Sequence, residues 1–303
     1  MMSSAVELIW DVEDVVYQDI EAACKTLYIE SLKDLPPDVR KAVQRAYDQE
    51  TYDIGKQILS TILENIDVAD QKKLLICQDT GIMVYFVKIG RNVRFDGVRL
   101  EEAIREGTKR ATLDHPLRSS ICNTITRKNT NTSTGKKVPV IHWEFVEGTS
   151  IELLALPKGS GSENMSYLKM LTPAAGLDGI KKYVIECVVE SGANPCPPTI
   201  VSVGLGGTAD LCAALAKKAA AREIGVPNPD PQLASLEKEL LEAINLTGIG
   251  PNGLGGASTA LAVHIESADT HITCNPVAVN MMCWPARRMR AHFKKNKDYQ
   301  ISY

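Results

Sequence analysis

The sequence predicts an α/β fold in which a helical N-terminal region precedes mixed sheets with packed helices. Apolar residues recur at three- and four-residue intervals in the first quarter of the chain, whereas β-branched runs alternate with helical segments in the remainder. With 303 residues, of which 44% are hydrophobic, the chain has ample material for a core. We therefore expect one compact unit over residues 1–303, which can be built from two lobes.

The helical region is expected over about residues 17–66. YQDIEAACKTLYIESL (17–32) has helical spacing, and PPDVRKAVQRAYDQE (36–50) opens with prolines that suit a helix start. Later helices are expected over 99–113, 176–192 and 234–248, and in the Ala-rich segment after the glycine turn at 204–207. Pro116 and Gly192 lie where the first two of these should end, and Gly248 is suited to cap the third.

The mixed region is expected over about residues 70–290. Val84, Tyr85, Phe86 and Val87 favour a strand, and residues 139–148 and 150–159 alternate apolar and polar side chains as paired strands do. A β-branched strand precedes the glycine turn at 204–207, and the last two expected strands lie at 258–267 and 275–284. Strands separated by helical segments predict an α/β arrangement.

Composition excludes several classes of protein. No apolar run reaches membrane-spanning length, and residues 1–16 lack the pattern of a signal peptide, so a cytoplasmic protein without a membrane partner is expected. Net charge is −3, and the basic segment 287–297 lacks the set of interleaved aromatic platforms on which nucleic-acid bases stack. It is therefore expected to be a solvated end rather than a nucleic-acid site.

The segment LICQDTG (75–81) places polar groups before an apolar run. One interpretation is a turn, to which Asp79 and Gly81 supply turn chemistry while Cys77 is a small buried hydrophobe. The other interpretation is a functional site.

Eight cysteines are present, and no pair has C-x-x-C spacing. Cys77, Cys196 and Cys283 lie at expected loops or strand ends. Three others lie on expected apolar helix faces and are interpreted as core residues: Cys24, Cys187 and Cys212. The interpretation of Cys122 and Cys274 is ambiguous. Three soft ligands from distant loops suit an iron–sulfur cube with one open iron, and a structural zinc site is the alternative.

Glycine-rich stretches suggest a cavity that favours anions. GLGGTADLC (204–212) follows a strand and precedes a helix, but it lacks the G-x-G-x-x-G spacing of a dinucleotide site. The alternatives are a small-anion site at the helix N-terminus and a simple tight turn. LPKGSGSENMS (156–166) and GIGPNGLGGAS (248–258) permit close approach of a carboxylate, with Lys158 and Arg118 as sources of positive charge. For any one of these loops considered alone, simple loop geometry is the favoured interpretation.

Five segments occur together in one order: CQDTG, LPKGSGSENMS, ANPCPP, HIESADTH and CWPARR. In this combination the chain resembles the α subunit of two-subunit class I fumarate hydratases and the related L-tartrate dehydratases, from about residue 20 to 290. The resemblance implies a [4Fe–4S] cluster with one iron not ligated by protein. Its three ligands correspond to Cys77, Cys196 and Cys283, whereas Cys274 stands where relatives commonly have a small residue and is left out.

The resemblance also implies reversible hydration of fumarate to L-malate, a step of the tricarboxylic acid cycle. Asp79 is then expected to deliver a proton to the departing hydroxide, and His271 of ADTH to relay it. The remaining residues of the implied site bind substrate carboxylates: Gln78, Arg118, Gly159, Ser160 and Gly161. Structural roles are the alternative, with Asp79 in a turn and His271 at a polar strand end.

The implied assembly contains more than this chain. Relatives complete the site with a further region that carries arginines, a lysine and a base, so we expect a separate β subunit and an α2β2 assembly. LPKGSGSENMS favours fumarate as the small dicarboxylate substrate over L-tartrate, which the related enzymes convert to oxaloacetate, and mesaconate fits the same chemistry. A non-catalytic cluster-binding subunit is the other alternative, although the presence of Gln78, Asp79 and Arg118 argues against it.

Overall fold

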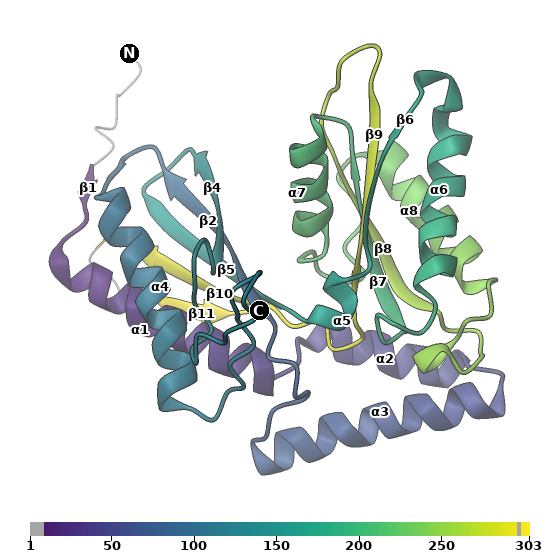
Figure 1. Ribbon diagram of the computed structural model, residues 1–303, viewed down its shortest axis with the longest axis horizontal. Coiled ribbons are helices and arrows are strands. Elements are labelled where there is room, and N and C mark those ends of the chain that lie inside the picture. Colours follow the sequence, from purple (N-terminus) through teal and green to yellow (C-terminus); the bar gives the residue numbers. More distant parts are fainter. Residues whose placement is uncertain (1–8, 296–297) are drawn as a thin grey trace, which may run out of the picture. The chain divides into compact units, whose positions relative to one another are not determined.

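The computed structural model describes residues 9–295 and 298–303 (Figure 1). The chain divides into two compact units, each assembled from separate segments. Unit 1 consists of Met1–Asp34, Cys77–Lys158 and Arg287–Tyr303, and unit 2 of Leu35–Ile76 and Gly159–Ala286. Residues 1–8, half of the stretch that lacks a signal-peptide pattern, lie outside the described residues.

Unit 1 is a five-stranded sheet with two packed helices. The strand order is β11-β10-β5-β2-β4, in which β2 runs parallel to β4 and antiparallel to β5. The strands are β2 (Ile82–Gly90), β4 (Val140–Val146), β5 (Ser150–Lys158), β10 (Met289–Lys294) and β11 (Gln300–Ser302). Helices α1 (Asp14–Lys33) and α4 (Gly97–Asp114) pack against each other, and Asp96 caps α4 by accepting the N–H groups of Val98 and Arg99.

Strand β10 corrects one expectation from the sequence. Residues 287–297 were expected to form a solvated basic end, but β10 pairs with β5 on one side and β11 on the other. Met289, Ala291 and Phe293 alternate with charged residues and are buried, at 5%, 0% and 3% exposed. Successive side chains of a strand point to opposite faces, so this alternation gives an amphipathic strand inside the basic segment.

Unit 2 is a four-stranded sheet with helices on both faces (Figure 1). The strand order is β6-β9-β7-β8, in which β7 is parallel to β8 and antiparallel to β9. The strands are β6 (Ser166–Leu171), β7 (Thr199–Leu205), β8 (Ala260–Ser267) and β9 (Asn275–Met282), and the helices are α2 (Pro37–Gln49), α3 (Asp53–Lys72), α5 (Ser160–Glu163), α6 (Gly176–Ser191), α7 (Ala209–Ala219) and α8 (Pro231–Asn245). Shorter elements are β1 (Trp10–Asp11) and β3 (Val93–Arg94), which pair in unit 1, and the 3-10 turns Pro173–Ala175 and Pro251–Gly253 in unit 2.

The two faces of the unit 2 sheet differ in chemistry. Valine, isoleucine and methionine side chains of β7, β8 and β9 pack with residues of α6 and α8 in one apolar cluster. The opposite face carries small and polar side chains, including Ser202, Asn280 and His264, which occupy one register row. There α7 approaches closely, because a Cβ on Gly204 would lie only 2.0 Å from the carbonyl O of Cys212. Gly204 therefore serves helix packing.

The structure confirms the predicted α/β class and most of the expected elements. The expected helical region near the N-terminus and the strands at 258–267 and 275–284 are present. Strand β6 was not expected, because only Ser166 belongs to the glycine-rich stretch 156–166 and residues 167–171 were assigned to no element. Among the described residues, no helix is both long enough and apolar enough to cross a membrane.

Candidate active site

The polar group before β2 forms a turn. Residues 77–81 lie outside the strand, which begins at Ile82, and Gly81 has a positive φ of 77°. The Gly81 N–H donates to Oδ1 of Asp79 at 2.9 Å, which is the local bond expected of an Asp in a turn. A Cβ on Gly81 would meet the backbone of Lys158 at 2.8 Å, so glycine is required for both conformation and space. The predicted departure from strand geometry is confirmed.

Buried side chains from elsewhere in unit 1 hold this turn. Arg287 Nη1 donates to the carbonyl O of Asp79 at 2.8 Å. The hydroxyl of Tyr28 lies 3.2 Å from the carbonyl O of Thr80, 3.4 Å from that of Gly81 and 3.2 Å from the Ser133 hydroxyl, so its single proton is shared among three acceptors. Tyr28 and Thr80 are fully buried and Arg287 is 1% exposed. We call Arg287, Tyr28 and the carbonyls of residues 79–81 the carbonyl clamp.

The turn is also joined to the predicted substrate arginine. The Thr80 hydroxyl donates to the carbonyl O of Arg118 at 2.7 Å. Gln78 and Arg118 are exposed, Cys77 and Asp79 are partly buried, and Thr80 is buried. Unit 1 therefore brings Cys77, Gln78 and Asp79 together with Arg118, an arrangement that can bind a carboxylate beside an acidic group.

In unit 2, the structure brings Cys196 and Cys283 to the same end of two adjacent strands. Cys196 precedes β7, Cys283 follows β9, and Ile200 of β7 pairs with Met282 of β9. The Trp284 N–H donates to the carbonyl O of Cys196 at 3.3 Å, which joins the two cysteine segments directly. Cys196 has a left-handed φ of 57°, which is uncommon for a non-glycine residue and is found most often at functional sites.

The predicted glycine loop lies beside the Cys196 segment. A Cβ on Gly161 would approach the carbonyl O of Asn194 to 3.2 Å, two residues before Cys196. Gly159 precedes the short helix α5, and Ser160 is exposed at its first position. Farther along α5, Glu163 forms an ion pair with Lys217 of α7 and accepts a bond from the Asn280 amide at 3.4 Å. Unit 2 thus groups Gly159–Gly161 with Cys196.

His271 lies elsewhere in unit 2. It is exposed on the loop between β8 and β9, where its Nδ1 is 2.9 Å from the Thr273 hydroxyl. Cys283 lies beyond the other end of β9, an eight-residue strand that spans roughly 25 Å at about 3.3 Å per residue. Cys274 lies at the same end as His271, so its exclusion from a site containing Cys283 agrees with the fold.

Thiol environment separates the eight cysteines. Burial raises the pKa of the Cys24 thiol to about 12, and those of Cys187 and Cys212 to about 11. Since metal ligation needs the thiolate, these three suit a packing role. Cys196 is exposed, and Cys77 and Cys283 are partly exposed. Their chemistry fits iron–sulfur ligation, although within either unit the described residues contain no group of three or more His, Cys, Asp and Glu side chains that could hold a metal ion.

The glycine turn at 204–207 does not provide free donors for a nucleotide. The N–H of Gly206 donates to the Pro276 carbonyl and that of Gly207 to the Asp269 carbonyl, both at 3.1 Å. At the start of α7, Asp210 accepts a bond from the Thr208 hydroxyl at 2.5 Å. Because these groups already have partners, the structure favours the tight-turn interpretation over anion binding.

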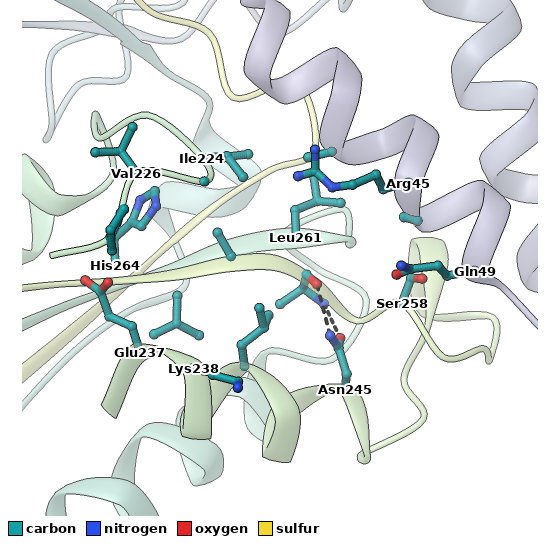
Figure 2. Close-up of a pocket in the computed structure, with 18 of the residues that line it drawn as sticks. Arg45, Gln49, Ile224, Val226, Glu237, Lys238, Asn245, Ser258, Leu261 and His264 are labelled. Atoms are coloured by element: carbon teal, nitrogen blue, oxygen red, sulfur yellow. Dashed lines mark hydrogen bonds between the residues drawn. The ribbon is translucent and has the colours of Figure 1, made fainter. Parts of the chain in front are cut away.

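A surface cavity of about 680 Å³ lies along β8, the edge strand of the unit 2 sheet (Figure 2). Helices α2 and α8 flank it, and none of the ten predicted site residues lines it. Asn245 bonds both backbone groups of Ala260, and Glu237 accepts the N–H of Ile265 at 2.8 Å. These side chains satisfy the ends of the exposed strand edge, which explains the polar groups that face the cavity.

Two residues of the carbonyl clamp were missed from the sequence. Tyr28 belongs to an ordinary amphipathic helix, and no local pattern distinguishes it. Arg287 had a weak signal, since it is a charged residue directly after an apolar strand in the CWPARR segment. A buried arginine is rare enough to mark a specific structural or functional task.

Comparison with known proteins identifies relatives along nearly the whole chain. A model of the fumarate hydratase (fumerase) family matches residues 21–292. A putative L(+)-tartrate dehydratase subunit alpha from Methanocaldococcus jannaschii is 46% identical over 265 residues, which cover 86% of this chain and 93% of the relative. The L(+)-tartrate dehydratase subunit alpha of Escherichia coli strain UTI89 is 36% identical over 261 residues, which cover 85% and 86% of the two chains. The K12 protein of that name is 35% identical over 255 residues, 84% of each chain.

Proposed function

Because this chain belongs to the fumarate hydratase family as an α subunit, we propose that it forms the cluster-carrying part of a hydro-lyase that acts on a four-carbon dicarboxylate together with a β subunit. The observation that carries this proposal is the turn at residues 77–81. It places a cysteine, an amide and a carboxyl in sequence and ties them to Arg118 through the bond from Thr80 to the Arg118 carbonyl. Such a segment can contribute to metal binding and to proton transfer.

The family implies an iron–sulfur cluster, and we assign its ligands to Cys77, Cys196 and Cys283. Supporting this assignment, Cys196 and Cys283 lie at one end of the β7–β9 pair, and all three thiols are at least partly exposed. Bound there by three cysteines, a [4Fe–4S] cluster would have one iron not ligated by protein and would supply Lewis-acid chemistry to the substrate.

This chain's own residues then supply binding and proton transfer. Arg118, Gln78 and the Gly159–Gly161 loop hold substrate carboxylates through charge and N–H donors. The Asp79 carboxyl gives a proton to the hydroxide that leaves the substrate carbon, and water departs. A base removes the proton from the neighbouring carbon, and the electron pair of the broken C–H bond forms the carbon–carbon double bond. That base belongs to the β subunit in this proposal.

His271 is assigned as the proton relay to Asp79, and its position suggests which copy supplies it. Since roughly 25 Å of β9 separates it from Cys283 in the same chain, His271 can serve that cluster only from a second copy. This agrees with the proposed α2β2 assembly. Coexpression of Asp79→Asn and His271→Ala chains should then restore part of the activity that each variant lacks by itself, and no restoration would contradict relay between copies.

The substrate is the finer question. The named relatives favour L(+)-tartrate, whose dehydration gives oxaloacetate, and the family model favours fumarate and L-malate. We propose L(+)-tartrate as the first substrate to test and the fumarate–malate pair as the second, with mesaconate as a variant of the latter. A cytoplasmic location is part of the proposal, because ligation of an iron–sulfur cluster needs reduced cysteine thiols.

The test is anaerobic coexpression of this chain with its β subunit, followed by assays on fumarate, L-malate and both tartrates. The assembled enzyme should turn over at least one of them, and the separate chain should have little activity even with its cluster rebuilt. An assembled, cluster-loaded enzyme that is inactive on all of them would contradict the proposed function. Robust turnover by the single chain would contradict the need for a partner.

A further inference from the structure

The carbonyl clamp contains one residue that stability alone explains poorly. Arg287 is 1% exposed, and its Nη1 holds the carbonyl O of Asp79 at 2.8 Å. Its Nε is buried and has no hydrogen-bond partner among the described residues. Burying a guanidinium with one donor unused is unfavourable, and apolar replacements of buried charges are often neutral or stabilising. A residue retained at this cost suggests a task other than packing.

The position of the bond identifies that task. Arg287 contacts the peptide group of Asp79 itself, whereas Tyr28 reaches the carbonyls of Thr80 and Gly81. Fixing the carbonyl of Asp79 fixes the plane of the peptide that follows it, and the Gly81 N–H then holds the carboxyl through Oδ1. Two bonds, one to each end of the same residue, restrict the direction in which the Asp79 side chain projects.

The clamp also works against the flexibility of the segment. Cys77, Gln78 and Asp79 belong to no strand or helix, and the next regular element, β2, begins at Ile82. The carbonyls of this turn lie outside the strand, so side-chain donors take the place of backbone partners. An enzyme loses rate steeply when a reacting group is displaced by about 1 Å, so a rigid turn has catalytic value.

We propose that Arg287 is a positioning residue that fixes the backbone of Asp79 and thereby aims its carboxyl at the substrate. The inference rests on the proposed function of Asp79. Arg287 touches no substrate in this account and acts only through Asp79. It occurs four residues after Cys283, so the CWPARR segment carries both a proposed cluster ligand and the donor that holds the proposed acid.

The test compares Arg287→Met and Arg287→Lys with a matched control on the following strand. Arg290 is suitable as the control, because it pairs with Glu152 at 3.1 Å and its side chain is 34% exposed. Each variant is assembled anaerobically with the β subunit, and iron content, kcat and KM are measured. Arg287→Met should lower kcat about 10- to 100-fold with KM changed less than about threefold and iron content unchanged.

Arg287→Lys should lie between the wild type and Arg287→Met, because an ammonium keeps a charged donor but not the planar geometry. Arg290→Met should stay within about twofold of the wild type. If Arg287→Met does not fold, Arg287→Lys decides: a fall of about 3- to 10-fold in kcat at constant iron supports positioning, and wild-type kcat refutes it. Equal losses of kcat, iron and thermal stability in both variants would also refute it, since they would indicate a structural role.

A second measurement separates this inference from the proposed function. Hydrogen–deuterium exchange of the peptide covering residues 74–86 needs no activity and can be followed in the full chain. Arg287→Met should increase exchange in this peptide at least severalfold, and Arg290→Met should not. If the wild-type assembly has no hydro-lyase activity, the proposed function fails while exchange still tests the clamp. Unchanged exchange in Arg287→Met would overturn the positioning inference.

Discussion

Each unit contains a backbone segment held by buried side chains. In one unit the side chains are hydrogen-bond donors, and in the other the side chain is an acceptor. In unit 1 the carbonyl clamp uses donors, the guanidinium of Arg287 and the hydroxyl of Tyr28, to hold backbone carbonyls. In unit 2 Glu50, which is 4% exposed, is an acceptor for four backbone N–H groups. These belong to Thr51 and Tyr52 at 3.0 and 3.1 Å and to Ala257 and Ser258 at 2.9 and 3.2 Å.

The difference in polarity predicts a difference in pH response. Burial by itself raises the pKa of the Glu50 carboxyl, but the four N–H donors outweigh it, so its pKa lies below the ordinary value near 4.5. Neither a phenol nor a guanidinium loses its proton in the acid range, and burial raises the pKa of Tyr28 further. The hydrogen bonds that the Glu50 carboxylate accepts should therefore weaken in acid, whereas those of the carbonyl clamp should not change. Only the latter carries a proposed catalytic group.

The largest expected effect concerns that catalytic group. Asp79→Asn preserves size and the bond to the Gly81 N–H but removes the acidic proton. In the assembled enzyme kcat should fall roughly 100-fold or more, while iron content and the cluster spectrum are unchanged. Asp96→Asn is the matched control, because Asn also caps helices well and Asp96 lies at the start of α4. Normal turnover by Asp79→Asn would mean that the polar segment is only a turn.

Glu50→Gln should lower stability rather than rate. The substitution removes one acceptor and turns an NH2 group toward backbone N–H donors, which should cost about 2 kcal/mol of unfolding free energy at pH 7. Denaturant unfolding measures the loss, and exchange should rise around residues 51–52 and 257–258. Glu147→Gln is the control, since Glu147 is 80% exposed in its pair with Arg91. A stability equal to that of the wild type would show that the four contacts contribute little.

The pH dependence of the same variant sharpens the comparison. A carboxyl with a lowered folded-state pKa contributes stability that is fully present above its unfolded value, near 4.5, and is lost as pH falls through the folded value. The stability difference between wild type and Glu50→Gln should therefore be constant from pH 7 to about 5 and shrink below that. A difference that persists unchanged to pH 3 would contradict the role of the ionised carboxylate.

The smallest effect is expected for Tyr28→Phe. The change removes the hydroxyl shared by the Thr80 and Gly81 carbonyls but leaves the Arg287 bond to Asp79. Unfolding free energy should fall by about 1 kcal/mol, with no dependence on pH between 4 and 8, and kcat should change less than about threefold. A loss of kcat as large as that of Arg287→Met would show that the whole turn, and not the Asp79 peptide, controls activity.

Prediction from sequence succeeded where a pattern is local. Helical spacing identified α1 and α2, β-branched runs identified β7, β8 and β9, and Gly81 marked the turn before β2. Strand β10 was missed because its charged residues alternate with buried Met289, Ala291 and Phe293, and the charges dominate the composition. An alternating pattern was present, but a basic cluster obscured it.

The site was partly predictable for the same reason. Motif resemblance selected Cys196 and Cys283, and the fold places them at one end of adjacent strands. The contacts that hold the site could not be predicted, since Tyr28 is 52 residues from Thr80 and Arg287 is 208 residues from Asp79 in the sequence. Their partners are backbone carbonyls, which leave no trace in side-chain patterns. The distance of His271 from Cys283 follows from the length of β9, the strand that lies between them.

In the proposed assembled enzyme, Cys77, Cys196 and Cys283 together hold one iron–sulfur cluster. The most direct test is the iron and sulfide content, with the matching absorbance and EPR spectra, of anaerobically purified Cys→Ser variants at each position, with Cys274→Ser as the control. Each of the three substitutions should remove most of the cluster and lower activity at least roughly 100-fold, whereas Cys274→Ser should retain both. A fully loaded cluster in any of the three variants, or its loss in Cys274→Ser, would contradict the account.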